Sequence, residues 1–160
     1  MSLSPIITID PKLDLVLERV VDVPVHLVWK AWTEPEHLKP WFCPKPWYVS
    51  ECEIDLRPGG MLRTTMNGPN GEVMPNVGCY LEIVPNARLV WTDALLPGYR
   101  PSGKPFMTGI IELKPEGAGT RYKATALHHD GATREQHEKM GFTEGWGTAL
   151  DQLVEYVKGL

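Results

Sequence analysis

Residues 146–157, Trp-Gly-Thr-Ala-Leu-Asp-Gln-Leu-Val-Glu-Tyr-Val, decide the fold class of this sequence. Its apolar positions recur at intervals of four, three and four, which is the spacing of one face of an α-helix. The polar residues between them fall on the other sides, so the segment predicts an amphipathic helix with one broad apolar face. That face consists of Trp146, Leu150, Leu153 and Val157.

Upstream of this helix, the sequence is a series of strand patterns separated by turns. Short clusters of glycine, proline and asparagine, as at 67–71 and 117–119, predict hairpins between them. Links this short join antiparallel strands, whereas parallel strands need long crossovers. An alternating segment at 13–20 and a helical pattern that starts at Pro24 come first. The later strand patterns cover 49–56, 61–66, 73–84, 88–94, 106–113 and 120–128.

Two capping-box pairs, a helix break and one long loop complete the pattern. Thr33 and Glu36 match a capping box that starts a second short helical turn, and Thr133 with Gln136 forms another. Gly141 predicts a break before the last helix, because glycine weakens a helix interior. Residues 95–105 form a long connection, which is often a functional rim or lid.

This order of elements predicts an α+β fold. An antiparallel sheet of about seven strands needs a cover on one face, and the last helix offers the one large apolar helix surface. We therefore expect a curved sheet wrapped around that helix, with an internal hydrophobic cavity between them. We expect one domain over 1–160, with its core at about 13–158 and an N-terminal arm at 1–11.

The space between a curled sheet and one helix is a natural ligand pocket. Alternation along the strands predicts which side chains face it, and the aromatic residues at 29–47 are expected to close one end. The alternative for each residue is that it only fills the core, because protein interiors are close-packed. The predicted ligand-binding residues are Trp29, Trp32, Phe42, Trp47, Leu62, Thr64, Met66, Tyr80, Trp91, Tyr122, Trp146 and Leu150.

His128 is the candidate catalytic residue, because it shares the predicted inward face of Tyr122. An enclosed histidine can act as a general acid or base, with Tyr80 or Tyr122 as its polar partner. The alternative is a histidine hydrogen-bonded at the end of a strand. Adjacent strand residues point to opposite faces, so His128 and His129 should not converge on a metal, and no metal or cofactor is predicted.

Composition narrows the class of protein further. A formal net charge of −4 disfavours nucleic-acid binding, and no apolar run approaches the roughly 18 residues that span a bilayer. No signal-peptide pattern is seen at 1–11, so a cytoplasmic location is expected. The three cysteines are expected to be reduced and mostly buried, with a reactive Cys43 as the alternative. Arg19, Asp93 and Glu112 are expected on solvated outer faces.

Several motifs, in order and spacing, resemble the SRPBCC (START-like) superfamily, and in particular its branch of activator-of-heat-shock-protein-ATPase homologues. The resemblance covers about residues 13–157, and no single motif carries it alone. The matching stretches are 18–25 and 28–41 at the start; Arg57-Pro58-Gly59-Gly60, 78–85 and 88–92 in the middle; and 119–121, 137–142 and Gly145-Trp146 at the end.

The resemblance implies the helix-grip fold: a seven-stranded antiparallel sheet that grips a long C-terminal helix around a deep hydrophobic cavity. It implies three functions, and whether the chain is an enzyme stays open. The first is binding of a small hydrophobic or aromatic ligand. The second is a cavity enzyme of cyclase or hydrolase type that uses His128 and a tyrosine. The third is a chaperone-accessory interaction module, although the separate N-terminal domain of the eukaryotic activator is not expected here. A homodimer is the alternative to a monomer.

Overall fold

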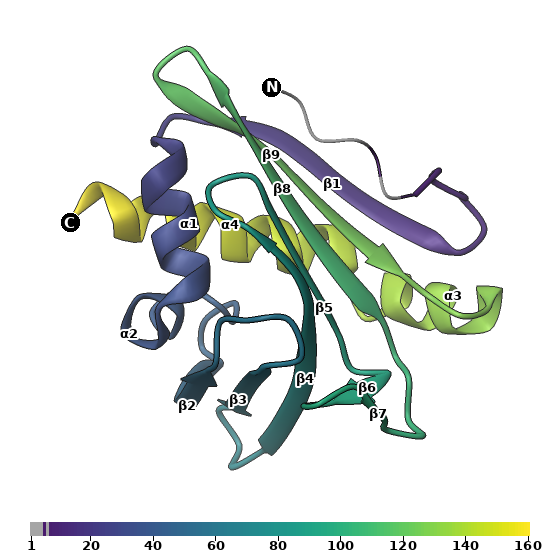
Figure 1. Cartoon of the computed structure of the whole chain (residues 1–160). Coiled ribbons are helices and arrows are strands. Elements are labelled where there is room, and N and C mark those ends of the chain that lie inside the picture. The colour runs from purple at the N-terminus through teal and green to yellow at the C-terminus, as the bar shows by residue number, and fades with distance from the viewer. Residues whose placement is uncertain (1–4, 6) are drawn as a thin grey trace.

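The computed structural model describes residue 5 and residues 7–160 of the chain. Figure 1 shows its helices and strands. In chain order they are β1 (Asp14–Val21), α1 (Val25–Thr33), α2 (Pro35–Leu38), β2 (Tyr48–Ile54), β3 (Met61–Asn67), β4 (Val73–Val84), β5 (Arg88–Thr92), β6 (Leu95–Leu96), β7 (Arg100–Pro101), β8 (Thr108–Glu116), β9 (Gly119–Leu127), α3 (Gly131–Lys139) and α4 (Phe142–Lys158).

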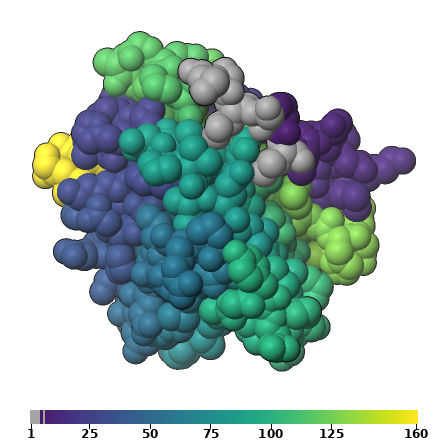
Figure 2. Space-filling model, in the orientation of Figure 1, coloured from purple at the N-terminus to yellow at the C-terminus, as the bar shows by residue number. Residues whose placement is uncertain are grey.

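Seven of the strands form one antiparallel sheet in the order β1-β9-β8-β5-β4-β3-β2. The strands from β2 to β9 follow one another as hairpins, and β1 pairs along its whole length with β9. The predicted antiparallel sheet is therefore confirmed. The long connection at 95–105 holds its own small hairpin, β6 and β7, which packs beside β4. There the amide of Gly98 donates to the carbonyl of Gly59, and this part of the surface is visible in Figure 2.

Helix α4 lies across the concave face of the sheet, as predicted, with α1 and α2 beside it (Figure 1). Its buried residues include Leu150, Leu153 and Val157, while Trp146 is half-buried. The strand registers confirm the predicted inward alternation, because Leu15 lies opposite Ala126 and Leu17 lies opposite Ala124. The architecture is the helix-grip fold.

The break before α4 is confirmed, but the predicted helix caps are wrong. Gly141 has a φ of 94°, in the left-handed region that glycine adopts at little cost, and it separates α3 from α4. Asp130 caps α3 by accepting a hydrogen bond from the amide of Thr133, in place of the predicted Thr133–Gln136 pair. The hydroxyl of Thr33 donates to the carbonyl of Trp29, so it does not start a capping box.

Arg19 lies on the concave face, not on the solvated outer face. It follows Leu15 and Leu17 at the inward spacing of β1, and its guanidinium reaches α4. Nη2 donates to the carbonyl of Gly147 over 2.7 Å and Nη1 pairs with Asp151 over 2.9 Å. This side chain ties the edge strand β1 to the first half of α4.

Glu112 lies on the outer face of the sheet, as expected, and both it and Asp93 have fixed partners. The carboxylate of Asp93 accepts hydrogen bonds from the amides of Phe106 and Met107, which orders the start of β8. Glu112 lies 3.8 Å from the buried guanidinium of Arg88, which also pairs with Glu82. Among the described helices, none is long and apolar enough to cross a membrane.

Candidate functional site

Four aromatic residues cross the concave face of the sheet; we call them the aromatic row, and they are Tyr80, Trp91, Trp32 and Tyr122. Tyr80 on β4 lies directly opposite Trp91 on β5. The rings of Trp91 and Trp32 have centroids 5.2 Å apart. The indole N–H of Trp32 donates to the hydroxyl of Tyr122 on β9 over 3.2 Å. The row thus connects β4 to β9 through α1, and all four residues were predicted ligand contacts.

The position of Trp91 depends on a glycine in the neighbouring strand. Gly109 on β8 lies opposite Trp91, and a Cβ at Gly109 would lie 2.5 Å from the indole ring. The ring therefore packs directly on the backbone of β8. Any residue larger than glycine at position 109 would collide with it. Close approach of this kind is a common reason for a glycine inside a strand.

The hydroxyl of Tyr80 is buried and has no hydrogen-bond partner. The whole residue is 0% exposed, and burial raises the pKa of its phenol, so the hydroxyl keeps its proton. A buried polar group without a partner costs about 1–3 kcal/mol. Such groups are rare in native proteins, so this one calls for an explanation.

The two buried tyrosines should respond in opposite ways to loss of the hydroxyl. Tyr122→Phe leaves the Trp32 indole N–H without its acceptor, so we expect a loss of about 1–3 kcal/mol in unfolding free energy. Tyr80→Phe removes a group that has no partner, so we expect no loss, or a gain of about 1 kcal/mol. Urea denaturation of both variants measures the difference. A larger loss for Tyr80→Phe than for Tyr122→Phe would contradict this assignment.

The connection between α2 and β2 closes one end of the row. Trp32 packs edge-on against both Trp41 and Phe42, with ring centroids 5.0 and 5.8 Å apart. Gln152 of α4 holds this connection in place: its amide N–H₂ donates to the carbonyls of Trp41 and Cys43, and its oxygen accepts from the Lys45 amide. The predicted stiff aromatic segment is thus tied to the helix that crosses the sheet.

The predicted ligand contacts fall into two groups by burial. The first group belongs to the closed interior, and the second is partly exposed around it. Buried are Trp32, Leu62, Thr64, Tyr80, Trp91, Tyr122 and Leu150; half-buried are Trp29, Phe42, Trp47, Met66 and Trp146. All of them except Trp47, Thr64 and Met66 pack in the hydrophobic core, and the role of each as a ligand contact remains a prediction.

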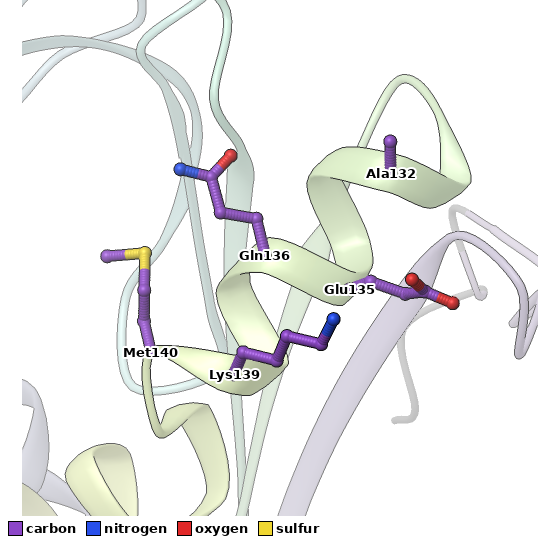
Figure 3. Close-up of a pocket in the computed structure, with 5 residues that line it drawn as sticks. All are labelled: Ala132, Glu135, Gln136, Lys139 and Met140. Carbon is purple, nitrogen blue, oxygen red and sulfur yellow. The ribbon is translucent and has the colours of Figure 1, made fainter.

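Two hollows of the described structure lie outside the space between the sheet and α4. One of about 200 Å³ lies where β5 and β9 end and β8 begins, beside Phe106 and His128. The other, about 390 Å³, lies along α3, and Figure 3 shows the five residues that line it. Neither is lined by a predicted ligand contact. In the described part of the chain, most of the side chains expected to line the cavity pack against one another instead, and Trp47, Thr64 and Met66 lie outside that cluster.

His128 is held by a histidine and a carbonyl, not by a tyrosine. Its Nδ1 lies 2.7 Å from the carbonyl oxygen of Leu13, so Nδ1 carries the proton, and its Nε2 lies 2.9 Å from Nδ1 of His137. Tyr122 lies about 20 Å away along the strand direction, and Tyr80 lies three strands away, about 14 Å. The structure therefore does not bring together the predicted histidine–tyrosine pair. His128 takes the alternative role, a hydrogen-bonded residue at the end of a strand.

No role for His137 was predicted from the sequence, because its contact with His128 depends on how the chain folds back after the turn at 128–131. It lies on α3 and is buried against the rings of Phe106, Phe142 and Trp146. Burial, and next the neighbouring His128, lower the pKa of His137 to about 4. The pair links α3 and the start of α4 to the end of β9.

This lowered pKa predicts that acid destabilises the fold through His137. As the pH falls below 6.5, His137 becomes protonated in the unfolded chain but stays neutral in the folded chain until about pH 4. The unfolded chain therefore binds more protons between these values, and stability falls across that range. We expect His137 to account for about 2 kcal/mol of this loss. In melting curves from pH 7.5 to 4.5, His137→Gln should show a shallower decline than wild type. Exposed His129→Gln is the control and should keep the wild-type slope; equal slopes for all three would contradict the prediction.

The remaining reactive side chains do not form a second site. Burial raises the pKa values of the Cys43 and Cys52 thiols to about 11, which opposes a reactive Cys43. All three cysteines are free thiols. In residue 5 and residues 7–160, no group of three or more acidic, histidine or cysteine side chains is placed to hold a metal ion.

A seven-stranded antiparallel sheet that holds a long helix in its concave face defines a helix-grip protein of the SRPBCC superfamily. Within that superfamily, residues 22–158 match the family described as Activator of Hsp90 ATPase homolog 1-like protein. The chain therefore belongs to this family. A comparison with curated protein sequences finds no match.

Solved structures of bacterial proteins share this architecture. Protein NE0264 from Nitrosomonas europaea is 53% identical, covers 94% of this chain and 97% of its own, and superposes with a TM-score of 0.92. Protein CV1439 from Chromobacterium violaceum is 26% identical over 89% of this chain and 96% of its own, with a TM-score of 0.72. An AHSA1-like protein from Aeromonas hydrophila, 18% identical over 92% and 93%, shares the fold with a TM-score of 0.68.

Proposed function

We propose that this chain binds a small, mainly apolar molecule between the concave face of the sheet, α1 and α4, next to Tyr80. The observation that carries the proposal is the buried Tyr80 hydroxyl without a partner. A ligand that bonds this hydroxyl recovers the free energy that burial costs, which gives the binding site both an apolar surface and one point of orientation.

The residues around the aromatic row support the same proposal. Trp91, Leu62 and Tyr122 present large apolar surfaces, which is the usual lining of small-molecule sites. Because these side chains now pack together, binding requires some of them to move. The half-buried Phe42, Trp47 and Met66 are the best placed to do so, since each is already in contact with solvent.

Membership of the family is consistent with binding but does not specify what is bound. The family description names a chaperone activator, and that name belongs to the proteins from which the family takes its description. The interior of this chain offers a more specific starting point, because an unpaired hydroxyl indicates the chemistry of its missing partner.

Native mass spectrometry of the chain purified from its own host tests the proposed function. We expect a fraction of the protein to carry a non-covalent small molecule, whose mass disappears when the same sample is denatured. The matched variant is Leu62→Trp, which enlarges a buried side chain on the concave face. It should lose the adduct if it still folds, as circular dichroism will show, whereas Met140→Trp, at an exposed residue just after α3, should keep it. Protein free of any adduct, in material that also binds none of the neutral probes described below, would overturn the proposal.

A further inference from the structure

The concave face of the sheet is almost free of charged side chains. Among the described residues of the large sheet, the one cationic side chain on this face is Arg19. Its charge is already paired: Nη1 binds the carboxylate of Asp151 and Nη2 the carbonyl of Gly147, while the buried Nε has no partner. Arg63, Arg88 and Arg121 face the other way, where each pairs with glutamates. No acidic side chain of these strands faces inward to balance a cation.

A charged ligand would therefore enter this interior without a counter-ion. Burying an unpaired ionised carboxylate or ammonium group is far more costly than burying a neutral polar group. Tyr80 cannot compensate as an anion, because burial raises the pKa of its phenol and keeps the hydroxyl neutral. The site thus selects against acids and amines.

Among the described residues, the concave face holds two buried polar atoms without a partner, the hydroxyl of Tyr80 and Nε of Arg19, and the hydroxyl is the one beside the aromatic row. A carbonyl oxygen accepts the phenol proton and brings no donor of its own, so one hydrogen bond satisfies both partners. A ligand hydroxyl brings its own proton as well, which then needs a second acceptor. Trp91 opposite Tyr80 and Leu62 on β3 offer no such acceptor in their side chains, and the neighbouring thiol of Cys52 is only a weak one.

We propose that the bound molecule is uncharged and aromatic or aliphatic, with a single carbonyl-type acceptor placed against the Tyr80 hydroxyl. This inference rests on the proposed function and makes it more specific. It assigns Tyr80 as the residue that distinguishes a neutral carbonyl compound from a hydrocarbon of the same shape, and it assigns the uncharged concave face as the reason that acids are rejected.

Three probes of nearly equal size test the inference by isothermal titration calorimetry at pH 7.5: 2-acetylnaphthalene, 2-isopropenylnaphthalene and 2-naphthoate. They present a carbonyl, its hydrocarbon counterpart and a carboxylate. For wild type we expect the ketone to bind about 5- to 10-fold more tightly than the hydrocarbon, the range of one hydrogen bond, and the carboxylate at least about tenfold more weakly than the ketone.

Tyr80→Phe should remove the preference for the ketone and leave the affinity for the hydrocarbon within about twofold of wild type. Tyr48→Phe, at an exposed tyrosine of β2 outside the proposed site, is the control and should retain the preference. If the ketone and hydrocarbon bind wild type equally, or Tyr80→Phe retains the difference, the inference is wrong while the proposed function stands. If naphthoate binds as tightly as the ketone, the argument from charge is wrong. If no probe binds and native mass spectrometry finds no adduct, the proposed function itself fails.

Discussion

Replacing Trp32 with alanine is expected to lower the free energy of unfolding by about 3–5 kcal/mol, the range for truncating a buried aromatic residue. Trp32 is 4% exposed and contacts the rings of Trp41, Phe42 and Trp91. The substitution also leaves the hydroxyl of Tyr122 without the indole N–H that it accepts. The loss thus combines a large cavity with a broken buried hydrogen bond.

Urea denaturation followed by far-ultraviolet circular dichroism measures this loss. Trp47→Ala is the control: the side chain is also an indole, but it is half-buried and packs at the edge, against Gly68. We expect a loss for Trp47→Ala that is less than half of that for Trp32→Ala. Equal losses in unfolding free energy for the two variants would contradict the claim that Trp32, within the aromatic row, stabilises the fold more than Trp47 at its edge.

Gly109→Val is expected to destabilise the protein by about 3 kcal/mol, at the upper end of the cost of overpacking a core. The first carbon of any side chain there would lie 2.5 Å from the Trp91 ring, so the indole must leave its position on β8. Trp91 contacts Trp32, so displacement at Gly109 should reach the whole aromatic row. The near-ultraviolet circular dichroism of the tryptophans should change together with stability.

Gly145→Ala is the matched glycine substitution for this test. Gly145 lies in α4, and a Cβ there meets no atom within 4 Å. Alanine is the better helix former, so we expect a gain of up to about 1 kcal/mol. A Gly109→Val variant as stable as wild type, with an unchanged near-ultraviolet spectrum, would show that Trp91 does not pack on the backbone of β8.

The architecture was predictable because its signals are periodic and local. The spacing of Trp146, Leu150 and Leu153 predicts a single apolar helix face, and that face indeed packs on the sheet. Turns such as 67–71 and 117–119 predict hairpins because glycine and asparagine adopt the required backbone conformations. Once the strands pair in this way, alternation places Tyr80, Trp91 and Tyr122 on the concave face without further information.

The contacts between elements were not predictable, because they depend on how helices settle on the sheet. Arg19 was expected in solvent, yet the alternation that places Leu15 and Leu17 inward also places Arg19 there, within reach of Gly147 and Asp151. The spacing of β1 was therefore a sufficient signal, and the charge of Arg19 was misleading. The role of Gln152 had no sequence signal, since its partners are main-chain atoms of a distant loop.

The candidate site shows the same limit. Sequence reasoning placed His128 with a tyrosine because both share a face of one strand, but a shared face does not bring together residues about 20 Å apart. Its true partner, His137, comes from α3 after a turn. The absence of a partner for the Tyr80 hydroxyl is also a property of the packed interior, since nothing in the neighbouring sequence distinguishes Tyr80 from Tyr122.

Chemical-shift mapping by ¹H–¹⁵N NMR, with 2-acetylnaphthalene titrated into the intact chain, tests the central claim most directly. We expect the perturbed amides to cluster on the concave side, at Tyr80, Trp91 and Gly109, together with the indole N–H of Trp32. Shifts confined to α3 or to the hollow beside Phe106 would contradict it, because binding would then occur outside the space between the sheet and α4.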